Sequence, residues 1–294
     1  MERERDETPA RRRTGVRLTD RDLIALEFVA EHRIVQRPHL QALLGVGPGA
    51  AAARLRALAG ADFLACDRSP DGRDDCYRIM ARGLAALGST LPPTRLDYGG
   101  FEHDVGAAWI WLAARDGLWG RPRDVVSERR MRSHDRSEDG RAAPFAVRLG
   151  GVGPRGADRL HYPDVLLIGA DGRRVAFELE LSAKSRSRRE RILSGYAADP
   201  RIGAVVYLVE SAAIGRAIQA TARKLGISDL IHVQRVERRR PGRGAAGGVD
   251  RAASRGDGER SGPGGAARRA AGGRGGAERG ARGSRDAGGE AAAR

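Results

Sequence analysis

The sequence predicts an α+β protein in which two folded parts are followed by a tail of low complexity. Three observations favour this class. Residues 16–92 combine helical apolar patterns with one candidate hairpin, residues 99–236 alternate strand-like runs with helical patterns, and residues 237–294 consist mainly of Gly, Ala, Arg and Ser. We therefore expect domains at 16–92 and 99–236, a linker at 93–98, and disordered segments at 1–15 (a basic arm) and 237–294.

The charge of the chain indicates a polyanionic partner. Its 294 residues include 53 Lys and Arg against 38 Asp and Glu, which gives a formal net charge of +15 at pH 7. Codon usage in a GC-rich genome also favours arginine, and only two of these 53 basic residues are lysines. Even so, a chain of this charge binds polyanions, and double-stranded DNA is the most abundant candidate in a cell.

The composition predicts a cytoplasmic protein that does not enter membranes. The sequence has no apolar run of about 18 residues, as a transmembrane helix requires, and its first residues, MERERDETPARRR, lack the apolar core of a signal peptide. No helical pattern joins a basic face to a large aromatic or leucine-rich face, so binding to a membrane surface is not expected. Cys66 and Cys76 fall in the candidate hairpin, and we expect both to be reduced.

Residues 16–92 show three helical patterns, a hairpin and a last short helix. Thr19 is a suitable N-cap for the first helix, with Asp22 at its third position. The apolar face of this helix and the residues after it comprises Leu23, Leu26, Phe28, Val29 and Ile34. The second helix, 38–45, and the third, 48–60, each begin at a proline and end at a glycine. Two short strands then flank a Pro-Asp-Gly turn, and a helix follows, ARGLAALG.

This order of elements is that of a winged helix-turn-helix, in which the third helix enters the major groove of DNA. Arg54 and Arg56 in the third helix are candidate DNA contacts, with a solvated helix face as the alternative interpretation. Arg68 and Arg73 in the hairpin are candidate phosphate contacts, although acidic residues surround them. The third helix is rich in alanine and has no Asn or Gln, so we expect contact mainly with the DNA backbone and weak sequence preference.

Residues 99–236 are interpreted as helix, three strands, helix, strand, helix and strand. The first helix begins near Phe101, and the sequence DVVSERRMR is typical of the first strand. Residues 133–160 are interpreted as a long polar loop or a poorly ordered hairpin. The apolar runs at 165–168 and 204–209 are continuous, as expected of buried central strands.

Three carboxylates and a lysine in this second part form a candidate catalytic site. Asp164 stands in a Pro-Asp step at the start of one predicted strand, and Glu178 and Glu180 share a face of the next. Such carboxylates bind Mg²⁺, which neutralises a scissile phosphate and activates a water molecule. If the site is catalytic, Asp164, Glu178 and Glu180 hold Mg²⁺ and Lys184 assists; otherwise we expect no cofactor.

Each of these features also has a structural interpretation. Pro-Asp steps commonly begin strands, and alternate glutamates often mark the solvated face of a strand. Lys184 either reaches back to the acids or begins the next helix, whose Arg186, Arg188 and Arg189 form either a phosphate-binding or a solvated face. Spacing does not choose which earlier residue completes the site. The candidates are Glu102, His103, Asp104 and Glu128.

The order of elements and the placement of the acids resemble the restriction-endonuclease-like, or PD-(D/E)xK, nuclease fold. In that fold a lysine usually stands two residues after the second acid, where this chain has Glu180, although some members carry an acid there. Lys184 lies four residues further along the chain. The resemblance therefore implies a mixed sheet and leaves the activity open.

The two parts together resemble the replication-relaxation family of plasmid and integrated-element proteins. The segments that carry this resemblance are ARLRALAGADFL, YRIMARGLAAL, FEHDVGAA, SERRMR, YPDVLLI and FELELSAKS. It implies a DNA-binding protein of a mobile element that acts in replication, relaxation or mobilisation of its DNA. The alternatives are an active Mg²⁺-dependent nuclease or nickase and a winged-helix transcriptional regulator. A second copy of the chain and replication or mobilisation proteins are further candidate partners.

Overall fold

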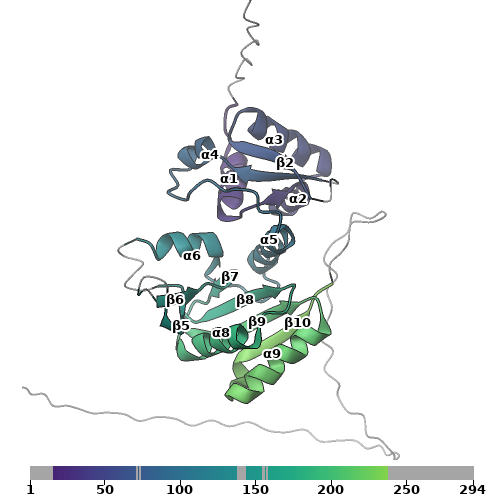
Figure 1. Cartoon of the computed structure of the whole chain (residues 1–294). Helices are drawn as coiled ribbons and strands as arrows, with labels where there is room; N and C mark the ends of the chain where they lie inside the picture. The colour runs from purple at the N-terminus through teal and green to yellow at the C-terminus, as the bar shows by residue number, and fades with distance from the viewer. Residues whose placement is uncertain are drawn as a thin grey trace, which may run out of the picture. The chain divides into compact units, whose positions relative to one another are not determined.

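The helices and strands fall into an N-terminal part around a small sheet and a second part built on a larger sheet (Figure 1). This computed structural model describes residues 16–70, 72, 74–137, 144–153, 156 and 158–237. The predicted basic arm and the tail after residue 237 lie outside the described residues. The predicted combination of helices with a mixed sheet is confirmed, and the described residues belong to one compact unit.

The N-terminal part interleaves its helices with a small antiparallel sheet. Its elements are α1 (Asp20–Glu31), β1 (Val35–Gln36), α2 (Arg37–Leu44), α3 (Pro48–Gly60), β2 (Leu64–Arg68), β3 (Asp75–Ile79) and α4 (Ala81–Ala86). The sheet has the order β1-β3-β2, and both strand pairs are antiparallel. The sequence does not reveal β1, because a strand of two residues is too short to show a pattern.

Helix α1 begins as the sequence predicts but faces its core slightly differently. The backbone N–H of Thr19 donates to Asp22 Oδ2 at 2.7 Å, so the predicted capping pair is present. The buried members of the predicted apolar face are Leu26, Phe28, Val29 and Ile34. The prediction for Leu23 is wrong, since this side chain is 37% exposed, and Ala25 lies in the core instead.

The hairpin of β2 and β3 keeps the two cysteines apart. Cys66 lies opposite Tyr77, and Cys76 lies opposite Asp67. Because successive residues of a strand point to opposite faces, the two thiols lie on different faces of the hairpin. Both cysteines are free, as the sequence predicts.

The second part is built on a mixed five-stranded sheet of order β10-β9-β8-β7-β4. Its elements are α5 (Phe101–Arg115), β4 (Asp124–Ser127), α6 (Glu128–His134), β5 (Val147–Val152), β6 (Asp158–His161), β7 (Val165–Ile168), β8 (Arg174–Glu180), α8 (Arg186–Ala198), β9 (Ile202–Val209), α9 (Ala212–Leu225), the 3₁₀ helix η2 (Ser228–Leu230) and β10 (Ile231–Arg235). Strand β7 is antiparallel to β4 and β8, whereas β8, β9 and β10 run parallel. Among the described residues, no helix has the length and apolar character needed to cross a membrane.

Helices cover both faces of this sheet (Figure 1). Alternate residues of β8 point to opposite faces, and Phe177 and Leu179 pack with Ile110 and Ala114 of α5. On the other face, helices α8 and α9 pack over Ala176 and its neighbours. The pattern places Glu178 and Glu180 on the α8 side, where they are covered rather than solvated.

Helix α5 also belongs to the core of the N-terminal part. Its Ala108 and Leu112 are buried in the same cluster as Leu26 and Phe28 of α1. At Gly106, α5 approaches β8 so closely that an added Cβ would overlap the Leu179 side chain. One helix therefore supplies side chains to two hydrophobic cores.

Two predictions for the second part are corrected by the structure. The strand predicted for DVVSERRMR ends at Ser127, and Glu128 begins helix α6 because the Ser127 hydroxyl accepts a hydrogen bond from the Arg130 N–H at 3.2 Å. The segment 133–160 contains strand β5 and all but the last residue of β6, and the two strands are paired antiparallel as a hairpin. Of the two alternatives left open by the sequence, the described residues favour the hairpin.

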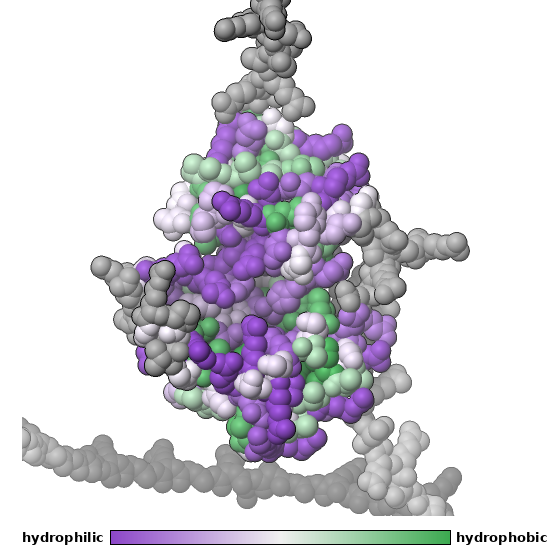
Figure 2. All heavy atoms as spheres, in the orientation of Figure 1, coloured by the Kyte–Doolittle hydropathy of each residue, from purple (hydrophilic) through white to green (hydrophobic). Residues whose placement is uncertain are grey.

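A polar junction joins α1 and the residues after it to α5 and α6. Hydrophilic residues gather across the middle of the face drawn in Figure 2, between the N-terminal helices and the sheet. Arg33 forms an ion pair with Glu128 at 3.2 Å, and Arg129 donates to the carbonyl oxygen of Ala30 at 2.9 Å and to that of Pro92 at 2.7 Å. These contacts hold the two parts together by charge as well as by the shared helix.

Glu31 lies at this junction beside a cavity of about 560 Å³. Its side chain is 12% exposed, one carboxylate oxygen has no hydrogen-bond partner among the described residues, and Arg130 is 4.0 Å from the other. Burial raises the pKa of Glu31 to about 7, against the weaker opposing influence of Arg130. Because the folded-state pKa lies above the ordinary value of 4.5, ionisation of Glu31 costs stability as the pH rises from about 4.5 to about 7.

We therefore expect Glu31→Gln to stabilise the protein at about pH 8 and to change little at about pH 5. The gain should be about 2 kcal/mol, or roughly 5 °C in the midpoint of thermal unfolding. Glu237→Gln, the same change at an exposed position after β10, is the control and should have no comparable effect. A Glu31→Gln protein that unfolds at or below the wild-type temperature at the higher pH would contradict this account.

Candidate functional site

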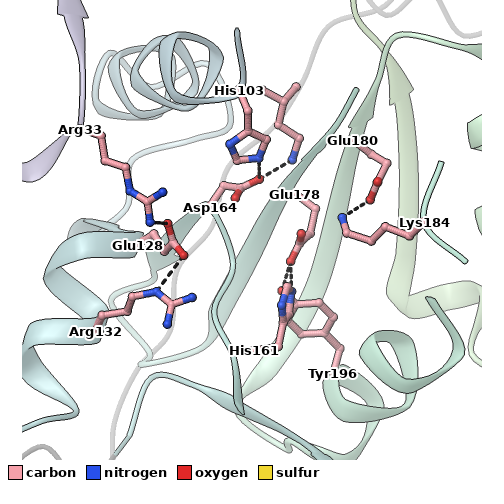
Figure 3. Close-up of polar contacts among 11 residues, drawn as sticks. Arg33, His103, Glu128, Arg132, His161, Asp164, Glu178, Glu180, Lys184 and Tyr196 are labelled. Carbon is pink, nitrogen blue, oxygen red and sulfur yellow. Dashed lines mark hydrogen bonds and ion pairs between the residues drawn. The ribbon is translucent and has the colours of Figure 1, made fainter. Parts of the chain in front are cut away.

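The three predicted acids lie at one end of the sheet, Asp164 just before β7 and the two glutamates on the neighbouring strand β8 (Figure 3). Val165 pairs with Phe177 across β7 and β8, and the backbone N–H of Asp164 donates to the Phe177 carbonyl at 3.0 Å. Asp164 therefore lies beside the segment that carries Glu178 and Glu180. The strand register thus brings together residues that are 14 or more positions apart in the sequence.

Asp164 is held by the backbone of β8 and by a histidine from α5. Its Oδ2 accepts a hydrogen bond from the Leu179 N–H at 2.7 Å and lies 3.1 Å from His103 Nε2. Burial alone would lower the pKa of His103, but the hydrogen bond and the charge of Asp164 outweigh it and raise this pKa to about 9. At neutral pH His103 is therefore an imidazolium.

Glu178 is the most deeply buried of the three acids. Its side chain is 3% exposed, and its Oε1 contacts both His161 Nε2, at 2.6 Å, and the hydroxyl of Tyr196. Burial favours the neutral carboxyl, yet the charge and hydrogen bond of His161, with help from Lys184 and Tyr196, hold the pKa of Glu178 below its ordinary value. Burial likewise opposes a charged His161, but Glu178 raises the pKa of this imidazole.

Glu180 is paired with the lysine that follows it. Lys184 lies just before α8, and its Nζ donates to Glu180 Oε2. Of the two possibilities for Lys184, the structure shows that it reaches back to the acids. Burial raises the pKa of Glu180, the charges of Glu178 and Asp164 raise it further, and Lys184 opposes this rise.

The other candidate acids fall around this centre in different ways. Glu128 accepts from Arg33 at 3.2 Å and from Arg132 at 2.8 Å, and the Arg132 guanidinium stacks over the Tyr162 ring at 4.4 Å. One oxygen of Asp104 is buried with no hydrogen-bond partner among the described residues, and burial raises the pKa of this carboxyl to about 6. Of the four candidates, His103 is the residue that touches a predicted site acid.

The predicted DNA-contacting arginines of the N-terminal part are engaged to different degrees. Arg54 donates from Nε and Nη2 to the buried carboxylate of Asp22, so its guanidinium is committed to α1. Arg56 is exposed, with a long contact of 3.3 Å from Nε to the carbonyl oxygen of Ala52. Arg68 is exposed and 4.0 Å from Asp75, and Arg73 lies outside the described residues.

The three predicted arginines of α8 also differ. Arg188 is exposed and forms no side-chain hydrogen bond or ion pair with the described residues, whereas Arg186 pairs with Glu190 at 3.0 Å. Arg189 donates to the hydroxyl of Thr221 in α9 at 2.8 Å and to the Lys184 carbonyl at 3.3 Å. Arg189 therefore joins α8 to its neighbours, and Arg188 is the one that faces solvent freely.

As arranged, these carboxylates do not fit a divalent metal. Mg²⁺ keeps open positions for water and phosphate, whereas Asp164, Glu178 and Glu180 are 11%, 3% and 6% exposed and each contacts a cationic side chain. Within the described ranges, no group of three or more His, Cys, Asp or Glu side chains could hold a metal ion. The binding of Mg²⁺ by these acids stays a prediction.

The sequence does not predict the contact of Glu178 with His161 and Tyr196, which lie 17 and 18 residues away. One signal was available, because Tyr196 falls four residues after Ile192 on the apolar side of α8. Comparison of the chain with models of protein families finds no match, and no curated protein matches it.

Proposed function

We propose that this chain is a DNA-binding protein of a mobile genetic element, with a winged helix at 16–92 and a restriction-endonuclease-like domain at 99–236. In this proposal the chain grips duplex DNA during replication, relaxation or mobilisation and does not cut it. The observation that carries the proposal is the order α1-β1-α2-α3-β2-β3 with the sheet β1-β3-β2. That is the arrangement in which a winged helix places its third helix in the major groove.

Helix α3 suits contact with the DNA backbone better than reading of bases. Its buried residues are Ala51, Leu55 and Leu58, and the opposite side presents Arg56 among alanines. Small side chains allow close approach of the helix, but they offer few hydrogen bonds to base edges. The proposed function is therefore binding with weak sequence preference.

The topology of the second part supports descent from a nuclease. The pairing of its acids with basic side chains argues against cleavage of DNA. The order α5, β4, β7, β8, α8, β9, with α6, β5 and β6 inserted between β4 and β7, and the mixed sheet support the endonuclease-like fold. The acids at its centre are neutralised by His103, His161 and Lys184. In the proposed function these pairs fix the ends of β7 and β8, and the domain serves as a binding scaffold.

The test combines DNA binding with plasmid relaxation. We expect short duplexes of unrelated sequence to bind with dissociation constants within about tenfold of one another. We also expect no nicking of supercoiled plasmid with Mg²⁺ or Mn²⁺. Failure to bind duplex DNA would refute the proposal.

Two other results would favour the alternatives. Metal-dependent nicking that Asp164→Ala abolishes would identify a nuclease instead. One tightly bound sequence among many weak ones, at a ratio of about 10³ or more, would identify a transcriptional regulator.

A further inference from the structure

We propose that the outer face of the helix pair α8 and α9 binds the phosphate backbone of duplex DNA and contributes most of the affinity for it. This inference rests on the proposed function and specifies which surface carries it. Unlike the sequence-based expectation, it assigns the main contact to the second part of the chain rather than to α3.

The first support is the distribution of charge along the chain. Residues 99–236 contain 23 Lys and Arg against 17 Asp and Glu, whereas residues 16–92 contain ten against nine. Within the second part, α8 and α9 have the largest excess of basic over acidic residues. Their basic residues are Arg186, Arg188, Arg189, Arg191, Arg216, Arg223 and Lys224, and Glu190 is the one acid in the two helices.

The second support is geometry, because the two helices form one layer (Figure 1). Arg189 of α8 donates to Thr221 of α9, and Lys224 of α9 pairs with Glu190 of α8 at 2.8 Å. The sides that face the sheet bury Ile192, Leu193, Tyr196, Ile218 and Ala222. The remaining basic residues therefore lie on the outer side or at its edges, and hydrophilic residues gather over α8 in Figure 2.

The third support is that most of this outer charge is not neutralised. Arg188, Arg216 and Arg223 are exposed and form no ion pair with any described residue. Glu190 is shared by Arg186 and Lys224. Arg216 and Arg223 are seven residues apart, which places them on one face of α9 about 10 Å from each other along the axis.

The chemistry of this face favours a nucleic-acid backbone over other polyanions. Guanidinium groups form paired hydrogen bonds with phosphate oxygens. Alanines at positions 212, 213 and 220 of the same helix are exposed, the first two before Arg216 and the third between Arg216 and Arg223, so the helix can approach a backbone closely. An anionic membrane would need large apolar side chains on the same face, and the exposed residues of α8 and α9 include none.

In the full chain, Arg188→Gln, Arg216→Gln and Arg223→Gln together should weaken binding to a short duplex by roughly 10- to 100-fold at about 100 mM salt. The slope of log affinity against log salt concentration should become shallower by about 2 to 3, one contact for each arginine. The matched control is Arg115→Gln, Arg121→Gln and Arg123→Gln, three exposed arginines without ion pairs among the described residues. The control carries the same charge change and should shift affinity less than about threefold.

Equal effects of the two triple variants would overturn the inference, because net charge alone would then explain them. Undiminished binding by the α8–α9 variant would also overturn it and would leave the proposed DNA-binding function intact. If the wild-type chain binds no duplex, both fail. Thermal unfolding of both variants within a few degrees of wild type confirms that the comparison is between folded proteins.

Discussion

Replacing His161 with leucine is expected to lower the free energy of unfolding by about 3 kcal/mol, because it removes the cation that is hydrogen-bonded to the buried Glu178 carboxylate. Tyr196 would still donate to Glu178, so the loss should not reach the full cost of an unpaired buried charge. Denaturant unfolding of wild type and variant measures the difference.

The pH dependence of this loss distinguishes a stranded carboxylate from a simple packing defect. Without the imidazolium, burial is expected to raise the pKa of Glu178 above its ordinary value. The folded protein would then hold a proton that the unfolded chain releases, so stability falls as the pH rises through that pKa. The loss should therefore be larger at about pH 6.5 than at about pH 5, a range in which the raised pKa of wild-type His161 keeps its imidazole largely protonated.

A second substitution supplies the control for His161→Leu. Adding Glu178→Leu removes the stranded charge, and an apolar pair in place of a buried ion pair often restores stability. We expect the double variant to regain more than half of the loss. A single variant as stable as wild type, or a double variant worse than the single, would contradict the pairing of these residues.

Arg54→Gln should cost about 2–4 kcal/mol of stability, whereas Arg56→Gln, two residues away on the same helix, should cost less than about 0.5 kcal/mol. Arg54 neutralises Asp22, whose side chain is 2% exposed, while Arg56 is exposed. Thermal unfolding of the two variants gives the comparison directly. Similar losses for both would show that Arg54 and Asp22 are not coupled as the structure indicates.

The same two variants should differ in the opposite order in their affinity for DNA. At temperatures where each protein is folded, Arg54→Gln should bind duplex DNA like wild type, because its guanidinium is committed to Asp22. Arg56→Gln should bind about twofold to fivefold more weakly through loss of one phosphate contact. A larger defect in Arg54→Gln would restore this residue as a DNA contact.

Local sequence patterns predict most elements, but they do not predict which side chains meet across the fold. Thr19 and Asp22 are three residues apart, so their capping interaction is visible in the sequence. The pairing of Asp22 with Arg54 joins residues 32 positions apart, and no local rule distinguishes Arg54 from Arg56 as the partner. Helical periodicity places both arginines near the helix surface, and packing against α1 decides between them.

In the candidate site too, the sequence predicts which acids share a strand face but not which helix covers them. The strand spacing predicts that Glu178 and Glu180 share a face of β8, and the register of β7 adds Asp164. The sequence does not show that this face is covered by α8, and so it suggests solvated or metal-bound acids instead of buried ion pairs. Burial comes from the helix layer, which is a property of the assembled domain.

Because α5 completes two cores at once, the N-terminal part and the sheet domain are not interchangeable modules. A protein cut at the linker 93–98 would leave Ala108 and Leu112 without their partners and would open the core around Leu26 and Phe28. A cut after residue 115 would instead separate Ile110 and Ala114 from Phe177 and Leu179 of the sheet. Neither side of α5 is therefore a neutral boundary, and recombination between related chains would have to exchange both parts together, although the sequence shows a break near residue 93.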